Sequence, residues 1–211
     1  ANIIFFAGGF SAADEPDGSA KFIVNILLNE KVRSAIDSFI EKGGLLIGIC
    51  NGFQALVKSG LLPYGNFAEA DDTSPTLFYN DANQHVAKMV ETRIANTNSP
   101  WLAGVHVGDV HAIAVSHGEG KFIVTPEEFA VLRDNGQIFS QYVDGNGQPS
   151  MDSKYNPNGS MNAIEGITSR NGQIIGKMGH SERWEDGLFQ NIPGNKDQKL
   201  FESAVRYFTG K

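Results

Sequence analysis

The single cysteine of this 211-residue chain, Cys50, lies in a pattern that favours nucleophilic chemistry. The segment Gly48-Ile49-Cys50-Asn51-Gly52 ends the apolar run Leu45–Ile49 and opens a helix-like pattern from Asn51 to Lys58. Glycines around a nucleophile are typical of a nucleophile elbow, a tight strand-to-helix turn that holds the side chain in a strained backbone region. The helix start would also favour a thiolate, and the Asn51 amide would offer a donor to an oxyanion.

The alternative is that Cys50 is an inert buried cysteine, so the histidines decide between the two interpretations. His180 directly follows the apolar run Ile174–Met178, and Glu182 stands two residues later. In extended backbone these two side chains would point to the same side. The sequence therefore predicts His180 as the base and Glu182 as the carboxylate that orients it.

The other four histidines are weaker candidates. We interpret His85 as a solvated loop residue, and His106 and His111 as structural. His117 lies in the polar, glycine-rich turn Ser116–Gly120 after an apolar run, where a strand end could meet a ligand. With one cysteine and no His-x-x-x-His pair, we expect no metal site. No Gly-x-x-x-x-Gly-Lys-Ser/Thr motif occurs, so we expect no ATP site either.

The elements that position these residues indicate an α/β fold. Two buried strands are predicted at Asn2–Ala7 and Leu45–Ile49, with helices at Ser19–Asn29, Lys31–Lys42 and Asn51–Lys58. This order favours a parallel sheet with helices on its faces. The second half of the sequence indicates shorter, more antiparallel strands, at Ala87–Ile94, His111–Val115, Phe122–Val124, Ile138–Val143, Ala163–Thr168 and Ile174–Met178. A last helix is predicted at Lys196–Thr209.

Composition limits the functional classes. Hydrophobic residues make up 41% of the chain, enough for one substantial core. The formal net charge of −7 argues against a nucleic-acid or polybasic membrane surface, because both need clustered Lys and Arg. A lone cysteine cannot form an internal disulfide and no signal peptide is visible, so a cytoplasmic protein is expected. The start at Ala1, directly before a strand-like run, suggests a piece of a longer chain.

Five motifs, in this order along the chain, resemble class I (triad-type) glutamine amidotransferases, and in particular the glutaminase part of phosphoribosylformylglycinamidine synthase. They are Gly8-Gly9-Phe10-Ser11, Gly48-Ile49-Cys50-Asn51-Gly52-Phe53-Gln54, Ala114-Val115-Ser116-His117-Gly118-Glu119-Gly120, Asn156-Pro157-Asn158-Gly159-Ser160 and Gly179-His180-Ser181-Glu182-Arg183. The resemblance implies a doubly wound, mostly parallel sheet with helices on both faces, the flavodoxin-like architecture of that class. It also implies that residues 1–211 form one glutaminase domain, C-terminal in a large single-chain synthase.

The resemblance also implies roles for individual residues. Cys50 would attack the side-chain amide of glutamine, His180 would move the proton, and Glu182 would hold His180. Backbone amides of Gly9, Phe10 and Asn51 would form the oxyanion hole. The rest of the substrate would be held by Gly8, Gln54, Ser116, His117, Gly118 and Glu119.

The implied partners are glutamine and a synthase module of the same enzyme, which would bind ATP and Mg; no cofactor is expected in this domain. The family has a further strand and helix before Gly8, which this sequence lacks. Either that strand is supplied elsewhere, or the sheet is completed by another chain, or the chain carries an unpaired strand edge. Two alternatives stay open. The first is a non-catalytic regulatory or assembly module, but the intact Cys50, His180 and Glu182 argue against it. The second is another elbow cysteine hydrolase, and the Asn-Gly-Phe-Gln ending of the elbow argues against that.

Some features have competing interpretations. Arg183 is expected to anchor the triad loop by an ion pair rather than to face the synthase module. Asn156–Ser160 is either a loop that touches that module or covers the site, or a plain turn of turn-forming residues. Trp101 and Trp184 are interpreted as packing residues.

Overall fold

The computed structural model describes residues 1–9 and 18–210. Its strands are β1 (Ile3–Phe6), β2 (Leu45–Ile49), β3 (Thr76–Tyr79), β4 (Val86–Ile94), β5 (Val110–His117), β6 (Glu119–Ile123), β7 (Ile138–Tyr142), β8 (Ile164–Thr168) and β9 (Ile174–Lys177). Its helices are α1 (Lys21–Leu27), α2 (Glu30–Glu41), α3 (Asn51–Lys58), α4 (Leu61–Tyr64), α5 (Pro126–Asp134) and α6 (Leu200–Thr209), with short 3₁₀ turns η1 (Pro100–Leu102), η2 (Met161–Ala163) and η3 (Ser181–Arg183).

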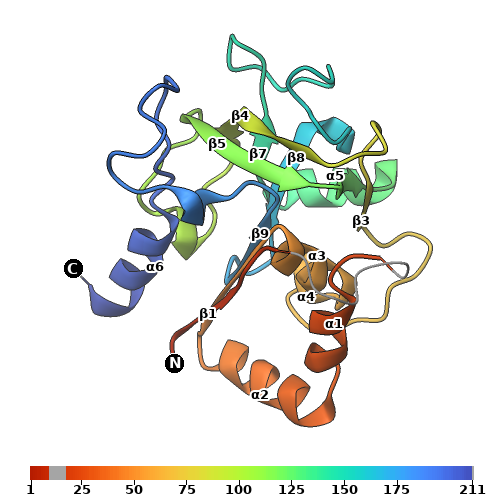
Figure 1. The fold of residues 1–211 in the computed structure, drawn as a ribbon. Coiled ribbons are helices and arrows are strands. Elements are labelled where there is room, and N and C mark those ends of the chain that lie inside the picture. Colours follow the sequence, from red (N-terminus) through yellow and green to blue (C-terminus); the bar gives the residue numbers. More distant parts are fainter. Residues whose placement is uncertain (10–17, 211) are drawn as a thin grey trace.

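Seven strands form one mixed sheet in the order β1-β2-β9-β8-β7-β4-β5, and β3 pairs with β6 in a separate ribbon (Figure 1). Only the pairs β1-β2 and β2-β9 are parallel; the remaining neighbours in the large sheet are antiparallel. The α/β class is confirmed, but the expectation of a mostly parallel sheet is corrected. Short connections such as the turn between β8 and β9 impose antiparallel pairing, because a parallel neighbour needs a crossover of about a dozen residues.

Helices cover both faces of the parallel part, as predicted. On one face, Gly52 of α3 packs against the backbone of Phe6 on β1. On the other face, Phe201 of α6 meets Phe5 edge-on, with ring centroids 5.6 Å apart. Every residue of β2 between these layers is buried, which explains its continuous apolar run.

The far edge of the sheet curls back over the end of β9. The His180 amide donates to the Ala114 carbonyl of β5 at 2.8 Å, and the Ala112 amide donates to Asn195 O at 2.7 Å. Figure 1 shows β4 and β5 crossing above β9. Because of this curl, a turn at the end of β5 reaches the turns that follow β1, β2 and β9.

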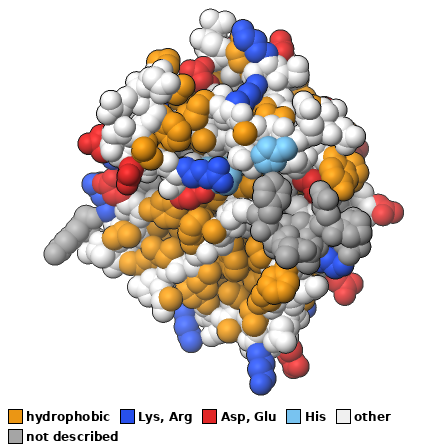
Figure 2. All heavy atoms as spheres, viewed as in Figure 1, with side chains coloured by type: hydrophobic (Ala, Val, Ile, Leu, Met, Phe, Trp, Pro, Cys, Tyr) orange, Lys and Arg blue, Asp and Glu red, His pale blue; other side chains and the backbone are white. Residues whose placement is uncertain are grey.

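Within the described residues β1 pairs only with β2 and is an edge strand, which is one of the three alternatives given for the missing strand. Phe5 on β1 is partly exposed, and Figure 2 shows apolar side chains gathered on the lower part of this face. No helix among residues 1–9 and 18–210 combines the length and apolarity needed to cross a bilayer.

The predicted elements match the structure most closely around the elbow, where β2 and α3 have the expected bounds. The first predicted helix is shorter, the last begins later, at Leu200, and β5 extends through His117. The sequence analysis did not find β3 or α5. In α5, Thr125 caps the Glu128 amide and Pro126 opens the helix, a start signal that was present in the sequence.

Candidate active site

Cys50 lies at the junction of β2 and α3 with φ 53° and ψ −109°. This is a region that residues with a Cβ rarely adopt, so the strained elbow predicted from the sequence is present. The flanking glycines are needed for close contacts. A methyl group on Gly52 would lie 2.0 Å from the Phe6 carbonyl oxygen, and one on Gly48 would lie 2.6 Å from Gly52 O.

The sulfur of Cys50 is nearly buried and donates a hydrogen bond to Ser116 O at 3.7 Å. Burial raises the pKa of the Cys50 thiol to about 11, although the Asn51 and Gly9 amides and the Arg183 charge lower it. The helix start does favour the thiolate, as expected, since the Asn51 amide lowers the pKa, but desolvation outweighs this effect in the free site. The same two amides face the sulfur, as an oxyanion hole requires. Phe10, the third predicted contributor, lies outside the described residues.

His180 and Glu182 form a close pair. Nδ1 of the buried His180 donates to Glu182 Oε1 at 2.6 Å. Burial raises the pKa of Glu182, but the hydrogen bond and charge of His180 outweigh it, so this pKa lies below its usual value. The other ring nitrogen of His180, Nε2, is buried and has no hydrogen-bond partner within the described residues.

Cys50 and His180 meet at Gly8. A methyl group on Gly8 would lie 2.7 Å from His180 Cε1 and 3.0 Å from Cys50 Cβ. No hydrogen bond joins the two side chains in the described part of the chain, since the thiol faces Ser116 O. A rotation of the thiol toward the unpartnered Nε2 is the movement that nucleophilic catalysis would need.

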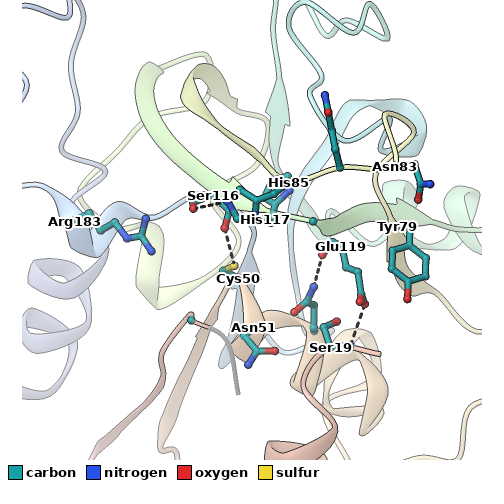
Figure 3. Close-up of a pocket in the computed structure, with 14 residues that line it drawn as sticks. Ser19, Cys50, Asn51, Tyr79, Asn83, His85, Ser116, His117, Glu119 and Arg183 are labelled. Atoms are coloured by element: carbon teal, nitrogen blue, oxygen red, sulfur yellow. Dashed lines mark hydrogen bonds between the residues drawn. The ribbon is translucent and has the colours of Figure 1, made fainter. Parts of the chain in front are cut away.

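A cavity of about 500 Å³ opens at the sulfur (Figure 3). This volume suits a small-molecule ligand. The predicted site residues that line it are Gly9, Cys50, Asn51, Gln54, Ser116, His117, Gly118 and Glu119. Gly8 packs between Cys50 and His180 instead. In Figure 3, Arg183 approaches from one side, and Tyr79 and Glu119 lie on the opposite side.

The Ser116–Gly120 turn is held from within the protein. The Gln54 amide donates to the Glu119 carbonyl, and the Glu119 carboxylate accepts from the Ser19 amide at 3.0 Å. Gln54 and Glu119 thus fix the shape of the cavity, and some of their hydrogen-bonding groups are already paired within the protein. By contrast, Asn51 Oδ1 is buried and has no partner within the described residues.

His117 is held as a neutral acceptor. Asn80 Nδ2 donates to His117 O at 2.8 Å, so its Oδ1 is the atom that accepts from His117 Nδ1 at 3.2 Å. Nε2 is then left with a lone pair, buried and without a partner among the described residues. Burial lowers the pKa of His117 to about 4, so the ring is uncharged at neutral pH.

We expect this shift to destabilise the protein in mild acid. Because the pKa of His117 is about 4 when folded and near 6.5 when unfolded, protons favour the unfolded chain as pH falls between these values. The His117→Gln variant should therefore lose about 2 kcal/mol less unfolding free energy than the parent between pH 7 and pH 5. Urea unfolding at both pH values measures this. His106→Gln, at a side chain that is 90% exposed, should match the parent, and equal losses in all three proteins would contradict the prediction.

The segment between β3 and β4 contributes cavity residues that the sequence analysis did not identify. Tyr79, Asn83, Gln84 and His85 line the cavity, and His85 Nε2 lies 3.1 Å from Ser116 Oγ. His85 is exposed in a loop, as predicted, but the loop borders the site. No local pattern in this polar stretch indicates that, because its place depends on the pairing of β3 with β6 and of β4 with β5.

Other interpretations are settled by their surroundings. Arg183 Nε lies 3.9 Å from Glu182 Oε1, in agreement with an ion pair that anchors the loop. His111 is buried in β5, as expected of a structural residue, whereas His106 is exposed beside Asp109, so its structural assignment is wrong. Trp101 is fully buried and donates to Gln173 O, in agreement with a packing role.

The segment Asn156–Ser160 is a structural turn. Asn158 Nδ2 donates to Gly120 O at 2.7 Å and to the Tyr142 hydroxyl at 3.0 Å, and Ser160 Oγ accepts from the Phe122 amide. These buried contacts hold Gly120 and Phe122 of β6, the strand that begins at Glu119. The segment supports the site from behind and does not line the cavity.

The fold and this site define an α/β protein with an elbow cysteine next to a carboxylate-bound histidine. Comparison with known families gives a more specific assignment. The model of the CobB/CobQ-like glutamine amidotransferase domain matches residues 1–208. The chain belongs to this glutamine amidotransferase family.

Two relatives and one solved structure are similar to this chain over most of its length. The phosphoribosylformylglycinamidine synthase subunit PurQ of Gloeobacter violaceus is 33% identical over 204 residues, covering 97% of this chain and 79% of the relative. The same subunit of Thermomicrobium roseum is 35% identical, covering 96% and 77%. A solved structure of PurLQS from Thermotoga maritima has a TM-score of 0.72 at 25% identity, covering 99% of this chain and 80% of that chain.

Proposed function

We propose that this chain hydrolyses glutamine to glutamate and ammonia and supplies the ammonia to a synthase that makes phosphoribosylformylglycinamidine in purine biosynthesis. The observation that carries the proposal is an elbow cysteine that lines a ligand-sized cavity and meets a carboxylate-bound histidine across Gly8, outside the cavity lining. Membership of a glutamine amidotransferase family and the similarity to PurQ subunits support the choice of substrate.

The chemistry is covalent catalysis at Cys50. The sulfur attacks the side-chain amide carbon of glutamine, and its proton moves to His180 Nε2. The C–N bond then breaks, the departing ammonia takes that proton, and a thioester remains. Water, deprotonated by His180, cleaves the thioester and releases glutamate. Glu182 holds the imidazole in the tautomer that leaves Nε2 free to accept, as its bond to Nδ1 requires.

Backbone amides stabilise the oxyanion of both tetrahedral intermediates. Those of Gly9 and Asn51 face the sulfur and are the donors we assign, with Phe10 as the third. The α-amino and α-carboxylate groups of glutamine are assigned to the part of the cavity formed by Gln54 and the turn from Ser116 to Glu119. There the His117 lone pair accepts from the substrate ammonium.

The proposed partner is an ATP- and Mg-dependent synthase module, with the domain acting in the cytoplasm and holding no cofactor of its own. The name of the PurLQS structure and the subunit names of the relatives support a separate synthase protein as that partner. The expectation that this domain is the C-terminal part of one large synthase chain stays a prediction, and the subunit names of those relatives do not support it.

A glutamine-like diazoketone tests the proposal directly, because it alkylates a thiol only after occupying the glutamine site. We expect one adduct per chain by intact mass, blocked by excess glutamine. The adduct should be absent in Cys50→Ala. Formation of glutamate from glutamine, with and without the synthase partner, gives the turnover.

The two alternatives give different results in the same experiment. An adduct that excess glutamine does not prevent would favour another elbow cysteine hydrolase. A folded chain that forms no adduct and no glutamate, even with the synthase present, would favour a non-catalytic assembly module.

A further inference from the structure

A buried ion pair lies directly behind the His180 segment. Lys177, the last residue of β9, and Glu165 on β8 both have fully buried side chains, with Nζ 3.4 Å from Oε1. Burial lowers the pKa of Lys177, which the Glu165 charge opposes. Burying two charges is costly, and further hydrogen bonds to the pair offset part of that cost, so these contacts show what the pair holds in place. Glu165 Oε2 is buried and has no partner within the described residues, so the contacts of Glu165 Oε1 and Lys177 Nζ are the ones that matter.

Glu165 holds the residue before His180. Its Oε1 accepts the Gly179 amide at 2.7 Å, a buried N–H at the end of a strand, which needs a partner inside the protein. Gly179 also lies against both charges, since a methyl group there would be 2.9 Å from Glu165 Oε1 and 3.3 Å from Lys177 Nζ. The absence of a side chain at this position lets the ion pair approach the His180 backbone.

Lys177 holds the residue after His180. Its Nζ donates to Ser181 Oγ at 2.8 Å and to Gln198 Oε1 at 2.7 Å. Ser181 Oγ donates in turn to the same Gln198 oxygen at 2.5 Å. The backbone before His180 and the side chain after it are therefore both fixed to one ion pair, while the His180 amide is fixed to β5.

We propose that Lys177 and Glu165 are positioning residues for His180, which clamp Gly179 and Ser181 so that the imidazole stays between Glu182 and Cys50. The inference rests on the proposed function, in which His180 moves the proton of Cys50. Neither Lys177 nor Glu165 lines the cavity, so their effect is on the proton transfer and not on contacts with glutamine.

The clamp formed by Lys177 and Glu165 also acts through charge. The Lys177 ammonium contributes to lowering the pKa of Glu182 and so favours the carboxylate that binds His180. Around His180 and Glu182, the other titratable and charged groups are Arg183, 3.9 Å from Glu182, Cys50 across Gly8, and His117, whose pKa the His180 charge lowers. Around Lys177 and Glu165 they include His111, whose pKa the Lys177 charge lowers, and Tyr142, whose pKa the Glu165 charge raises. A pH profile of Cys50 reactivity therefore reports on the clamp.

The test is the double variant Lys177→Met/Glu165→Gln, which removes both charges together and keeps an acceptor for the Gly179 amide. Its rate of Cys50 alkylation by iodoacetamide should fall about tenfold at pH 7.5, where His180 must take the proton. The deficit should shrink as pH approaches the thiol pKa of about 11, since hydroxide then removes that proton. For glutamine hydrolysis, kcat should fall to a similar extent with KM within about twofold.

Ser181→Ala isolates the clamp if the double variant does not fold. Ser99→Ala is its matched control, because Ser99 Oγ also makes two buried hydrogen bonds, to Gly172 O and from the Trp101 amide. We expect Ser181→Ala to show the pH-dependent deficit and Ser99→Ala to show none.

An unchanged pH profile in Ser181→Ala, or a deficit equal at every pH, would overturn the inference. If the parent protein does not hydrolyse glutamine yet the alkylation deficit appears, the positioning role stands and the proposed substrate fails.

Discussion

We expect the Cys50→Ala variant to lose glutamine hydrolysis by about a thousandfold or more while it keeps its fold. No other cysteine exists in the chain to form the thioester, and the amides of Gly9 and Asn51 alone stabilise only the charge of the intermediate. The substitution removes only the sulfur atom, from a side chain that is 6% exposed, so the packing around it should change little. Glutamate production measures the loss, and circular dichroism with thermal unfolding checks the fold.

The same position offers an internal control for backbone strain. With φ 53° and ψ −109°, Cys50 has a conformation that glycine adopts at little cost and alanine does not. We expect Cys50→Gly to be more stable than Cys50→Ala by about 1 kcal/mol, with both inactive. Equal stability of the two variants would show that the elbow stores no strain. Residual turnover above about one-hundredth of the parent in either variant would remove Cys50 from the mechanism.

The second large effect is expected for Gly52→Ala. A methyl group there would lie 2.0 Å from the Phe6 oxygen and 2.6 Å from the Phe6 carbonyl carbon, both backbone atoms that no side-chain rotation can relieve. Either α3 or β1 must shift. We expect a loss of about 3 kcal/mol of unfolding free energy, or roughly 6–12 °C in melting temperature.

The displacement of α3 or β1 would also affect catalysis. β1 carries the Gly8-Gly9 turn, where Gly8 separates Cys50 from His180 and the Gly9 amide faces the sulfur. Glutamine hydrolysis by the folded fraction should therefore fall at least tenfold. Gly145→Ala is the matched control, since a methyl group there meets nothing within 4 Å, and it should change stability by less than about 0.5 kcal/mol. A Gly52→Ala protein as stable as Gly145→Ala would contradict the packing argument.

The sequence predicts those parts of the site that depend on neighbouring residues. The elbow follows from an apolar strand, flanking glycines and a helix pattern, and the structure has β2 and α3 at the predicted bounds. The His180–Glu182 pair follows from a two-residue spacing. The meeting of four strand-end turns also follows from a general rule for α/β sheets, although the turn after β5 arrives by the curl of antiparallel strands.

The rest depends on contacts between distant segments, which no local pattern encodes. His85 borders the cavity because β3 and β4 hold its loop there. Lys177 occupies a position in β9 that a strand pattern allows for a solvated lysine, and its pairing with Glu165 depends on the β8-β9 register. The raised pKa of Cys50 is a sum of burial and amide dipoles, whose balance appears only when all the atoms are placed.

The raised pKa of Cys50 also affects how resistant the thiol is to oxidation between turnovers. Peroxides and most biological oxidants attack the thiolate, and at pH 7.5 a thiol with a pKa of about 11 is ionised in only about one molecule in three thousand. Cys50 in its free site is therefore protected against oxidation to a sulfenic acid by the same burial that makes it a poor nucleophile. In the proposed mechanism the sulfur becomes reactive only when His180 accepts its proton, so Cys50 is open to oxidation only during catalysis.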